Sequence, residues 1–276
     1  IFADEWGYAH APGRDGEGIG YIGPAIMIHG TEDQKKEHIG GIARGEVVWA
    51  QGYSEPESGS DLASLSTRAV LEGDEWVING QKIWTSQAHV ADWILLLART
   101  DPEAPKHRGI TMFLVDMKAD GVSVRPIIDL TGGHPFNETF FDNVRVPNGN
   151  VVGEVNRGWY AGMTLLDFER SGVEYAAVSR RALDETRNFA SVTKTNGKSL
   201  IELPNIKHKL SEMAINVEIS YMLSYQIAYI QSKGEVPNKE ASMGKMFGTE
   251  IEQRTFQMAM QVLGLYGQLT PTSFRT

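Results

Sequence analysis

The sequence predicts an α+β protein, with helices at the N-terminus, an antiparallel β barrel or sandwich in the middle and an up-down helical bundle at the C-terminus. Three observations support this prediction. Residues 1–45 contain helical patterns joined by Gly-rich loops, residues 46–152 contain short β-rich runs separated by turn residues, and apolar residues after Trp159 recur at helical spacing. We therefore predict three domains, which span residues 1–45, 46–152 and 153–276.

The first domain contains one well-marked helix. Thr31 and the acidic residues after it are typical of a capped helix N-terminus, and we expect this helix to end near Gly40. The preceding segment, Ile19–Gly30, is mostly apolar and belongs to the same set of helical fragments.

Short runs of apolar and β-branched residues dominate the middle domain, and Gly-Asp, Asn-Gly and Ala-Asp-Gly turn signals separate them. Because several strands follow one another without intervening helices, they favour an antiparallel sandwich or barrel. Asn79-Gly80 is a hairpin signal, which places Ile83 and Trp84 on the returning strand. The predicted strands are residues 67–71, 75–78, 93–99, 110–115 and 121–128, with Phe140, Phe141, Val144 and Val146 closing the sheet.

Three long helices are predicted in the C-terminal domain. The first covers residues 158–190. The second begins at Pro204 and ends before Gly234, with apolar residues at steps of three or four. The third covers residues 239–265, and its apolar stripe is predicted to fill the bundle core rather than to form a ligand site. This stripe consists of Met243, Met246, Phe247, Ile251, Met258 and Val262.

Composition argues against several classes of function. The formal net charge is −9 without a run of Lys and Arg, which argues against a nucleic-acid-binding surface. The sequence has no Cys, and its scattered histidines lack the spacing of a metal site. The longest apolar run, Trp93–Ala98, is too short to span a membrane, and the first residues are acidic, unlike a secretory signal. We therefore expect a cytoplasmic protein that binds neither nucleic acid nor metal.

Two stretches stand out as a candidate site. Trp49–Asp61 begins as an apolar run and ends in small, hydroxyl-bearing and acidic residues, and Gln81–Ser86 combines an aromatic ring with two hydroxyl groups. Hydroxyls and backbone N–H groups in such a turn can meet an anionic or carbonyl-rich ligand. The alternative is a turn that caps the next element through Ser60 or Asp61, and spacing alone favours this second interpretation.

The order of motifs along the chain resembles that of the acyl-CoA dehydrogenase family. The resemblance rests on WAQGYSEPESGSD, WVINGQKIWTS, RTDPEAPKHRGITMFLVDM, FNETFFDNVRVPNGNVVGEVNRGW, LLDFERS and QVLGLYG, which together cover nearly the whole chain. It implies a flavoprotein that binds FAD and acyl-CoA, and it implies that both terminal helical domains are incomplete. The implied reaction oxidises acyl-CoA to a trans-2-enoyl-CoA, and electrons then pass to an electron-transfer flavoprotein.

The resemblance also implies a set of cofactor-binding residues. These are Gln51, Tyr53, Ser54, Ser60, Trp84, Thr85, Ser86, Gln261 and Gly264. Trp84 would flank the flavin ring, and Ser86 would hydrogen-bond near its reactive nitrogen. Ser60 would lie where the flavin phosphate and the acyl-CoA chain come close. Gln261 and Gly264 would contact the flavin of a neighbouring subunit.

Glu169 is the candidate catalytic base. Oxidation of a thioester needs a base for the α-proton, an acceptor for the β-hydride and donors that polarise the carbonyl. Leu166–Arg170 resembles the LDxER setting in which one branch of the family carries its catalytic Glu. Asp167 and Arg170 would orient the acyl-CoA, Arg170 through its fork of donors. Other branches carry the base in a later loop, so a base beyond residue 276 is the alternative.

One departure from the family pattern concerns Thr193–Lys198. Many members carry an Arg-x-x-Phe-Gly-Lys stretch that reaches the flavin across a subunit interface, and this sequence lacks both the Arg and the Phe. Lys194 or Lys198 could supply a point charge instead. The family implies a homodimer or tetramer, and this departure leaves a heteromer open. The alternatives to a dehydrogenase are therefore a non-catalytic partner subunit and an acyl-CoA oxidase.

Overall fold

The computed structural model describes residues 2–11, 16–170, 172–235 and 237–269. Contacts divide the chain into two compact units. The sheet unit comprises Arg14–Glu169, and the bundle unit comprises Ile1–Gly13 and Arg170–Thr276. The predicted α+β class is confirmed, because helices flank a sheet-rich middle part. The predicted domain boundaries near residues 45 and 152 stay a prediction.

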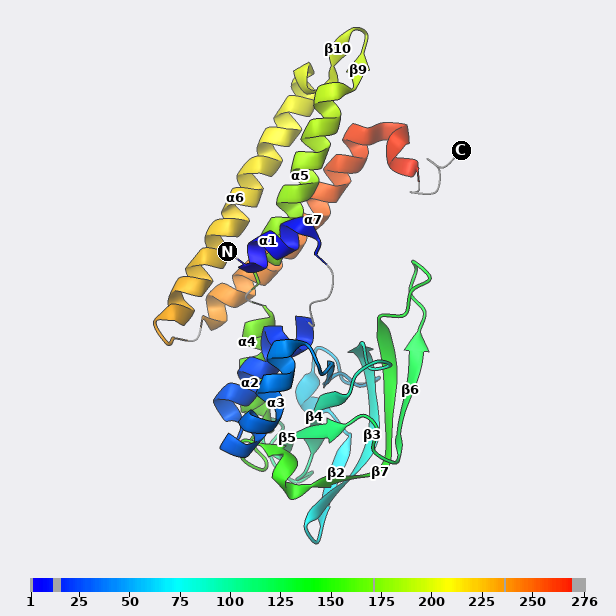
Figure 1. The fold of residues 1–276 in the computed structure, drawn as a ribbon, viewed down its shortest axis with the longest axis vertical. Helices are drawn as coiled ribbons and strands as arrows, with labels where there is room; N and C mark the ends of the chain where they lie inside the picture. The colour runs from blue at the N-terminus through cyan, green and yellow to red at the C-terminus, as the bar shows by residue number, and fades with distance from the viewer. Residues whose placement is uncertain (1, 12–15, 171, 236, 270–276) are drawn as a thin grey trace. The chain divides into compact units, whose positions relative to one another are not determined.

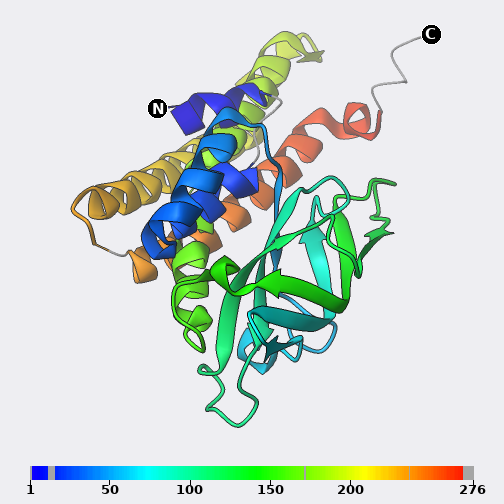
Figure 2. The ribbon, with the colours of Figure 1, turned by 60° about the horizontal axis from the view of Figure 1, so that its bottom comes forward.

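One eight-stranded sheet forms the centre of the sheet unit (Figure 1), in the order β6-β7-β3-β2-β4-β5-β8 with β1 beside β4. The strands are β1 (Trp49–Gly52), β2 (Arg68–Glu72), β3 (Glu75–Ser86), β4 (Trp93–Arg99), β5 (Ile110–Asp116), β6 (Val122–Ile127), β7 (Phe136–Pro147) and β8 (Val151–Val152). Most neighbouring strands are antiparallel, as predicted. The exceptions are β1, which pairs with β4 in parallel, and one parallel contact between β2 and β4. Figure 2 shows the strong twist of these strands.

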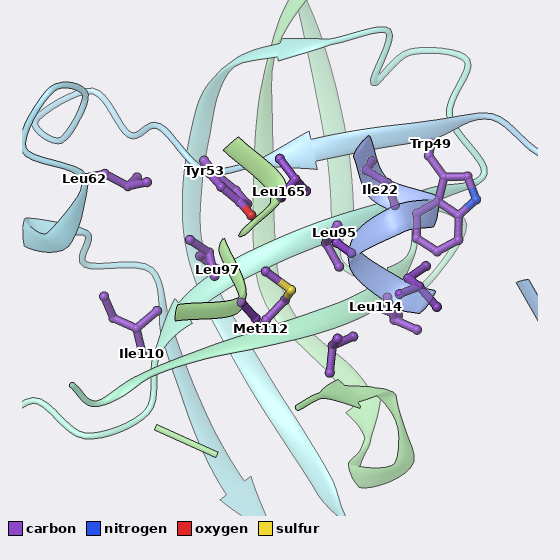
Figure 3. Close-up of a cluster of buried hydrophobic side chains, with 14 of the residues drawn as sticks. Ile22, Trp49, Tyr53, Leu62, Leu95, Leu97, Ile110, Met112, Leu114 and Leu165 are labelled. Atoms are coloured by element: carbon purple, nitrogen blue, oxygen red, sulfur yellow. The ribbon is translucent and has the colours of Figure 1, made fainter. Parts of the chain in front are cut away.

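Both faces of the sheet are covered by apolar side chains. Along β4, Leu95 and Leu97 join one core cluster while Ile94 and Leu96 join the other, because successive side chains of a strand point to opposite faces. The first cluster (Figure 3) also receives Leu165 and other apolar residues from the helices of this unit. These helices are η1 (Gly18–Ile22), α2 (Gly23–His29), α3 (Glu32–Arg44) and α4 (Gly158–Glu169), with short turns at η2 (Leu62–Ser64) and η3 (Asn148–Asn150).

The predicted start of helix α3 is confirmed. Thr31 caps it, since the Thr31 hydroxyl accepts a hydrogen bond from Gln34 N at 3.2 Å and the Gln34 side chain accepts one from Thr31 N at 3.0 Å. The helix continues to Arg44, beyond the predicted end near Gly40, and stops at Gly45, whose φ is +67°.

The predicted hairpin at Asn79-Gly80 is wrong, because β3 runs through both residues. Instead, the Asn79 side chain exchanges hydrogen bonds with Asn143 on β7, at 2.8 and 3.2 Å. A Cβ atom on Gly80 would lie only 2.5–2.8 Å from atoms of Thr67, so the glycine permits a close approach within an irregular ladder rather than a chain reversal. The chain reverses earlier, at Gly73, whose φ is +64°.

Three helices run side by side in the bundle unit (Figure 1): α5 (Glu174–Val192), α6 (Pro204–Ser232) and α7 (Asn238–Leu263). Helix α1 (Phe2–Ala9) packs against α5, where a Cβ on Gly7 would lie 3.1 Å from Ala177 Cβ. The predicted bounds of α6 at Pro204 and Gly234 are confirmed. Smaller elements are β9 (Lys194–Thr195), β10 (Lys198–Ser199), η4 (Leu200–Glu202) and η5 (Gly264–Gln268). In the described part of the chain, no helix is both long and apolar enough to cross a membrane.

Two expectations about these helices are wrong. The helix predicted over residues 158–190 is two helices, α4 and α5, and Gly172 lies in the break between them, since Gly disfavours helix continuation. The predicted core stripe of α7 is also partly wrong, because Met243 and Met246 are exposed. The buried face instead uses smaller residues at the same helical spacing: Ala241, Gly248, Ile251, Thr255, Met258 and Val262.

Candidate functional site

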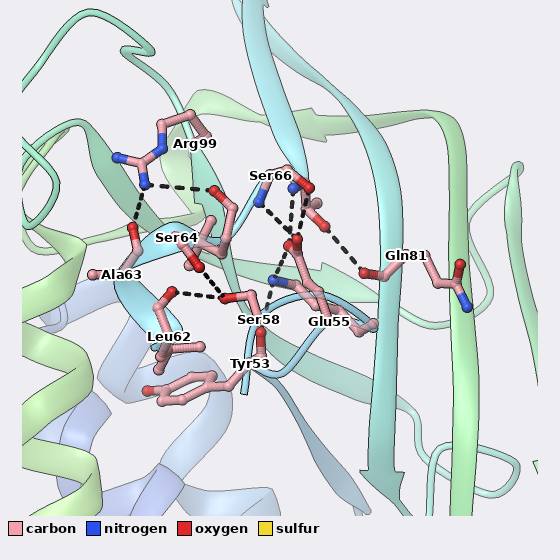
Figure 4. Close-up of polar contacts among 12 residues, drawn as sticks. Tyr53, Glu55, Ser58, Leu62, Ala63, Ser64, Ser66, Gln81 and Arg99 are labelled. Carbon is pink, nitrogen blue, oxygen red and sulfur yellow. Dashed lines mark hydrogen bonds and ion pairs between the residues drawn. The ribbon is translucent and has the colours of Figure 1, made fainter. Parts of the chain in front are cut away.

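The two stretches identified in the sequence lie side by side in the sheet unit (Figure 4). Ile83 N donates to Ser54 O at 2.9 Å, and Lys82 Nζ donates to Tyr53 O at 2.9 Å. The turn that follows β1 is therefore fastened to the last residues of β3. As a result, Ser54 and the Trp84–Ser86 segment belong to one local site.

A buried ion pair joins the two stretches. Lys82 is fully buried and Glu55 is 6% exposed, and Lys82 Nζ lies 2.8 Å from Glu55 Oε1. The Glu55 carboxylate also accepts hydrogen bonds from Ser66 N at 2.6 Å, Ser66 Oγ at 2.8 Å and Thr67 N at 2.9 Å. Glu55 thus connects the turn after β1, the segment that enters β2, and β3.

The two charges of this pair are affected differently by their surroundings. Burial by itself would raise the pKa of Glu55, but the Lys82 charge and the hydrogen bonds to the carboxylate outweigh burial and lower this pKa. Burial lowers the pKa of Lys82, and the Glu55 charge only partly opposes that effect. A buried charge needs such partners, because an unpaired one is expensive to keep from water.

The turn itself is held by backbone and hydroxyl contacts. Glu55 and Ser58 exchange backbone hydrogen bonds at 2.8 and 3.0 Å, and the buried Ser58 hydroxyl donates to Asp61 O at 2.9 Å. The alternative capping role is not observed. Asp61 occupies the N-cap position of η2 without a side-chain cap, and its carboxylate pairs with Lys106 instead. Ser60 is exposed at the surface of the turn.

The end of β3 has an unusual backbone. Trp84 has a φ of +60°, which is rare for a bulky residue, and its side chain is 57% exposed. The pairing register between β3 and β7 shifts between Lys82 and Thr85, so a β-bulge lies at this point. The Trp84 ring meets the Phe136 ring edge to face, with 6.2 Å between the centroids.

Hydroxyl groups around this bulge differ in their surroundings. The Thr85 side chain is buried, and within the described residues its hydroxyl has no hydrogen-bond partner. Ser54 and Ser86 are half-buried, and neither hydroxyl bonds to another residue of the described ranges. Together with the exposed face of Trp84, these two hydroxyls could meet a flat aromatic ligand that has a polar edge.

Helix α4 brings Glu169 into the electrostatic environment of the same site. Tyr53 is buried against this helix, and a Cβ on Gly162 would lie 3.3 Å from the Tyr53 hydroxyl. Burial raises the pKa of Tyr53, and the negative charge of Glu169 raises it further. Gly162 and Glu169 are seven residues apart, so they share one face of the helix. Asp167 is half-buried one residue pair earlier on α4.

The remaining candidates belong to the bundle unit. Arg170 is its first residue after α4 and is half-buried. Gln261 accepts a hydrogen bond from Lys209, and Gly264 ends α7 with a φ of +58°. Lys194 and Lys198 are exposed on the β9–β10 hairpin. The predicted roles of all these residues stay predictions.

Sequence reasoning missed Glu55, Lys82 and Asn137. Asn137 on β7 is fully buried, and its Nδ2 donates to Thr85 O at 3.0 Å. One signal could have pointed to the ion pair: a single Lys between apolar residues of a strand, with a single Glu in the facing turn. Among the described residues, no cluster of three or more His, Asp or Glu side chains is arranged to hold a metal ion.

Two family models match the chain. Residues 50–144 match the acyl-CoA dehydrogenase middle domain, and residues 156–275 match the acyl-CoA dehydrogenase C-terminal domain. Acyl-CoA dehydrogenase FadE29 of Mycobacterium tuberculosis is 42% identical over 247 residues, which cover 89% of this chain and 63% of that protein. The crystal structure of the ChsE4-ChsE5 complex from Mycobacterium tuberculosis is similar with a TM-score of 0.88 and 38% identity, over 99% of this chain and 70% of that chain.

A further relative is the caffeyl-CoA reductase-Etf complex subunit CarC of Acetobacterium woodii, which is 33% identical over 251 residues, covering 90% of this chain and 66% of that protein. The chain therefore belongs to the acyl-CoA dehydrogenase family, as the order of its motifs predicts. The chain spans 63% of the length of FadE29, so the activity of a whole protein of this family is a proposal for this chain.

Proposed function

We propose that this chain carries the α,β-dehydrogenation of an acyl-CoA thioester to a trans-2-enoyl-CoA, with Glu169 as the base for the α-proton. One observation supports this most directly: Glu169 is near enough to Tyr53 for its charge to raise the pKa of that hydroxyl. The candidate base and the turn that carries Ser54 therefore belong to one local environment. A carboxylate beside a ligand-sized polar site is what proton abstraction next to a thioester carbonyl requires.

FAD fits the residues of this site. The half-buried Ser54 and Ser86 hydroxyls have the donor chemistry for the polar edge of a flavin, and the exposed face of Trp84 suits its aromatic ring. A bound FAD would take up the two electrons and the β-hydrogen removed from the substrate. In this proposal the backbone of Gln51 and Tyr53 borders the ring.

Other residues of the proposed site orient the substrate and the distal part of the cofactor. Ser60, exposed on the turn, lies near the phosphates, and Asp167 and Arg170 orient the acyl-CoA, Arg170 as a bidentate donor. Gln261 and Gly264 reach the FAD of a second subunit in a dimer or tetramer. Each of these roles follows from the family pattern of motifs.

Partners of the protein are part of the same proposal. Electrons pass from the reduced cofactor to an electron-transfer flavoprotein, and a relative that is named as a subunit of an Etf complex supports this route. A second candidate function is that of a partner subunit in a heteromer. It is favoured by the missing Arg and Phe around Lys194 and by the similarity to a chain of the two-protein ChsE4-ChsE5 complex.

An anaerobic titration of the intact natural protein with a panel of acyl-CoAs tests these proposals. Wild type and Glu169→Gln are compared by loss of visible flavin absorbance, with Glu185→Gln as a control on the exposed face of α5. We expect wild type and the control to bleach, and Glu169→Gln to bind acyl-CoA without bleaching. The best substrate then identifies the acyl class.

The other outcomes are equally informative. Normal bleaching by Glu169→Gln would assign the base to a residue outside residues 1–276. A wild type that holds no flavin, but gains flavin and activity together with a co-purified related chain, would establish the partner-subunit function. Rapid reoxidation of the reduced flavin by oxygen would identify an oxidase instead of a dehydrogenase.

A further inference from the structure

We propose that Lys82, Glu55 and Asn137 are positioning residues, which hold the strained bulge at Trp84 in the conformation that presents Trp84 and Ser86 to the cofactor. The cofactor part of this inference rests on the proposed function. The bulge itself is a feature of the chain, because β3 places three steps, from Lys82 to Thr85, opposite two steps of β7, from Thr139 to Asn137. One residue is therefore extra on β3.

The extra residue redirects the side chains at the end of β3. Lys82 and Thr85 are both buried although an odd number of residues separates them by position, and Trp84 between them is exposed. In a regular strand, alternation would not produce this pattern. The positive φ of Trp84, +60°, completes the change of direction and is unfavourable for a residue with a Cβ atom. Strain of this kind persists only where surrounding contacts enforce it.

Lys82 supplies such contacts immediately before the bulge. Its ammonium group bonds to Tyr53 O at 2.9 Å and to Glu55 Oε1 at 2.8 Å, while the next residue, Ile83, donates its N–H to Ser54 O at 2.9 Å. Both sides of the candidate flavin edge are thus fixed by one side chain. The Glu55 carboxylate is itself fixed by donors from the segment before β2, so the anchor is rigid.

Asn137 supplies the contact immediately after the bulge. Its Nδ2 bonds to Thr85 O at 3.0 Å, which fixes the peptide between Thr85 and Ser86. Asn137 Nδ2 also lies 3.3 Å from His89 Nδ1, beyond the end of β3. The strained residue is therefore bracketed, with Lys82 on one side and Asn137 on the other.

Lys82 and Asn137 act through other residues. Both are fully buried, so neither side chain is open to a ligand at the surface of the site. Their effect on the cofactor is the position of the Trp84 ring and the Ser86 hydroxyl. Small displacements of such groups are costly, because aligned contacts lose much of their strength when atoms move by about 1 Å.

The test compares Lys82→Met and Asn137→Leu with Val144→Ala in the intact natural protein. Val144 is fully buried on β7 and belongs to the core cluster around Phe113, so its truncation destabilises the same sheet without a contact at the bulge. Glu55→Gln, which keeps acceptor oxygen at the anchor, is the second variant if Lys82→Met does not fold. The readouts are the FAD dissociation constant, the shape of the visible flavin spectrum and amide hydrogen exchange over residues 83–87.

We expect the bulge variants to raise the FAD dissociation constant by about tenfold or more and to speed exchange over residues 83–87, whereas Val144→Ala changes both by less than about threefold at a comparable loss of stability. If the three variants lose FAD only in proportion to their stability and exchange at 83–87 is unchanged, the positioning role is overturned. If wild type holds no FAD but Lys82→Met still speeds this exchange, the bulge assignment stands and the proposed flavin function fails.

Discussion

Gly158→Ala provides a direct test of how α4 carries Glu169 to the site. Gly158 is the first residue of α4, and a Cβ atom there would lie 2.4 Å from Met112 N and 2.6 Å from Thr111 C, both backbone atoms of β5. Such distances are below any that Cβ atoms tolerate. Because backbone cannot rotate away as a side chain can, the helix must move from the strand.

The required movement is large for a packed contact. An ordinary contact of 3.4 Å needs a shift of about 1 Å between α4 and β5. The chain before α4 resists this shift, because Asn156 N donates to Thr111 Oγ1 at 2.8 Å and Gly109 N donates to Asn156 O at 3.2 Å. We therefore expect the free energy of unfolding to fall by about 3 kcal/mol, at the upper end of the range for overpacked cores. Displacement of Glu169 by this amount should lower kcat by about 100-fold.

Urea unfolding followed by tryptophan fluorescence measures the stability effect in the sheet unit, which contains Trp49, Trp76, Trp84, Trp93 and Trp159. Gly149→Ala is the matched control, since a Cβ at this exposed glycine meets nothing within 4 Å. A Gly158→Ala protein that unfolds within about 0.5 kcal/mol of wild type would refute the reasoning, because it would mean that α4 accommodates the methyl group without strain. Unchanged kcat in a destabilised variant would separate the packing of α4 from the position of Glu169.

Three further predictions concern other contacts. Thr31→Ala should lower the stability of the sheet unit by about 1 kcal/mol through loss of the helix cap, with no change if the cap is formed by water in its place, and urea unfolding measures this. Burial opposes, but the Lys82 charge and hydrogen bonds produce, a pKa of about 2 for Glu55, below its ordinary 4.5; this stabilisation is present above pH 4.5 and lost as the pH falls toward 2, so unfolding free energies of Glu55→Gln should depend less on pH in this window. Tyr221→Phe removes a 2.6 Å hydrogen bond to the buried Asp4 and should destabilise the bundle unit by about 2 kcal/mol in a circular-dichroism melt, whereas equal stability would mean that water replaces the donor.

Local chemistry was sufficient to predict several element boundaries. Thr31 begins α3 because its side chain satisfies a free N–H of the first turn, and Pro204 begins α6 because the first turn needs no N–H from it. Both signals act within four residues along the chain. The two polar stretches of the candidate site could also be found from sequence, and the structure brings them together.

Features set by distant contacts could not be predicted in this way. Asn79-Gly80 has the composition of a hairpin turn, yet its role is set by the approach of Thr67 and by pairing with β7. The buried position of Lys82 was equally inaccessible, because two register shifts in β3 break the alternation that would have assigned its side chain to a face. Met243 and Met246 were misassigned because apolar character alone does not decide which face of a helix is covered.

The ion pair between Lys82 and Glu55 is hard to explain by stability alone. Two buried charges lose their hydration, and apolar side chains of similar volume would often stabilise a protein equally well or better. What an apolar side chain cannot provide is a directed bond to Tyr53 O, one residue from the Ser54 hydroxyl. The neighbouring Trp84 departs from backbone preferences in the same few residues. A costly charge beside a strained aromatic residue is expected where geometry, rather than stability, is being selected, and this favours a positioning role for the pair.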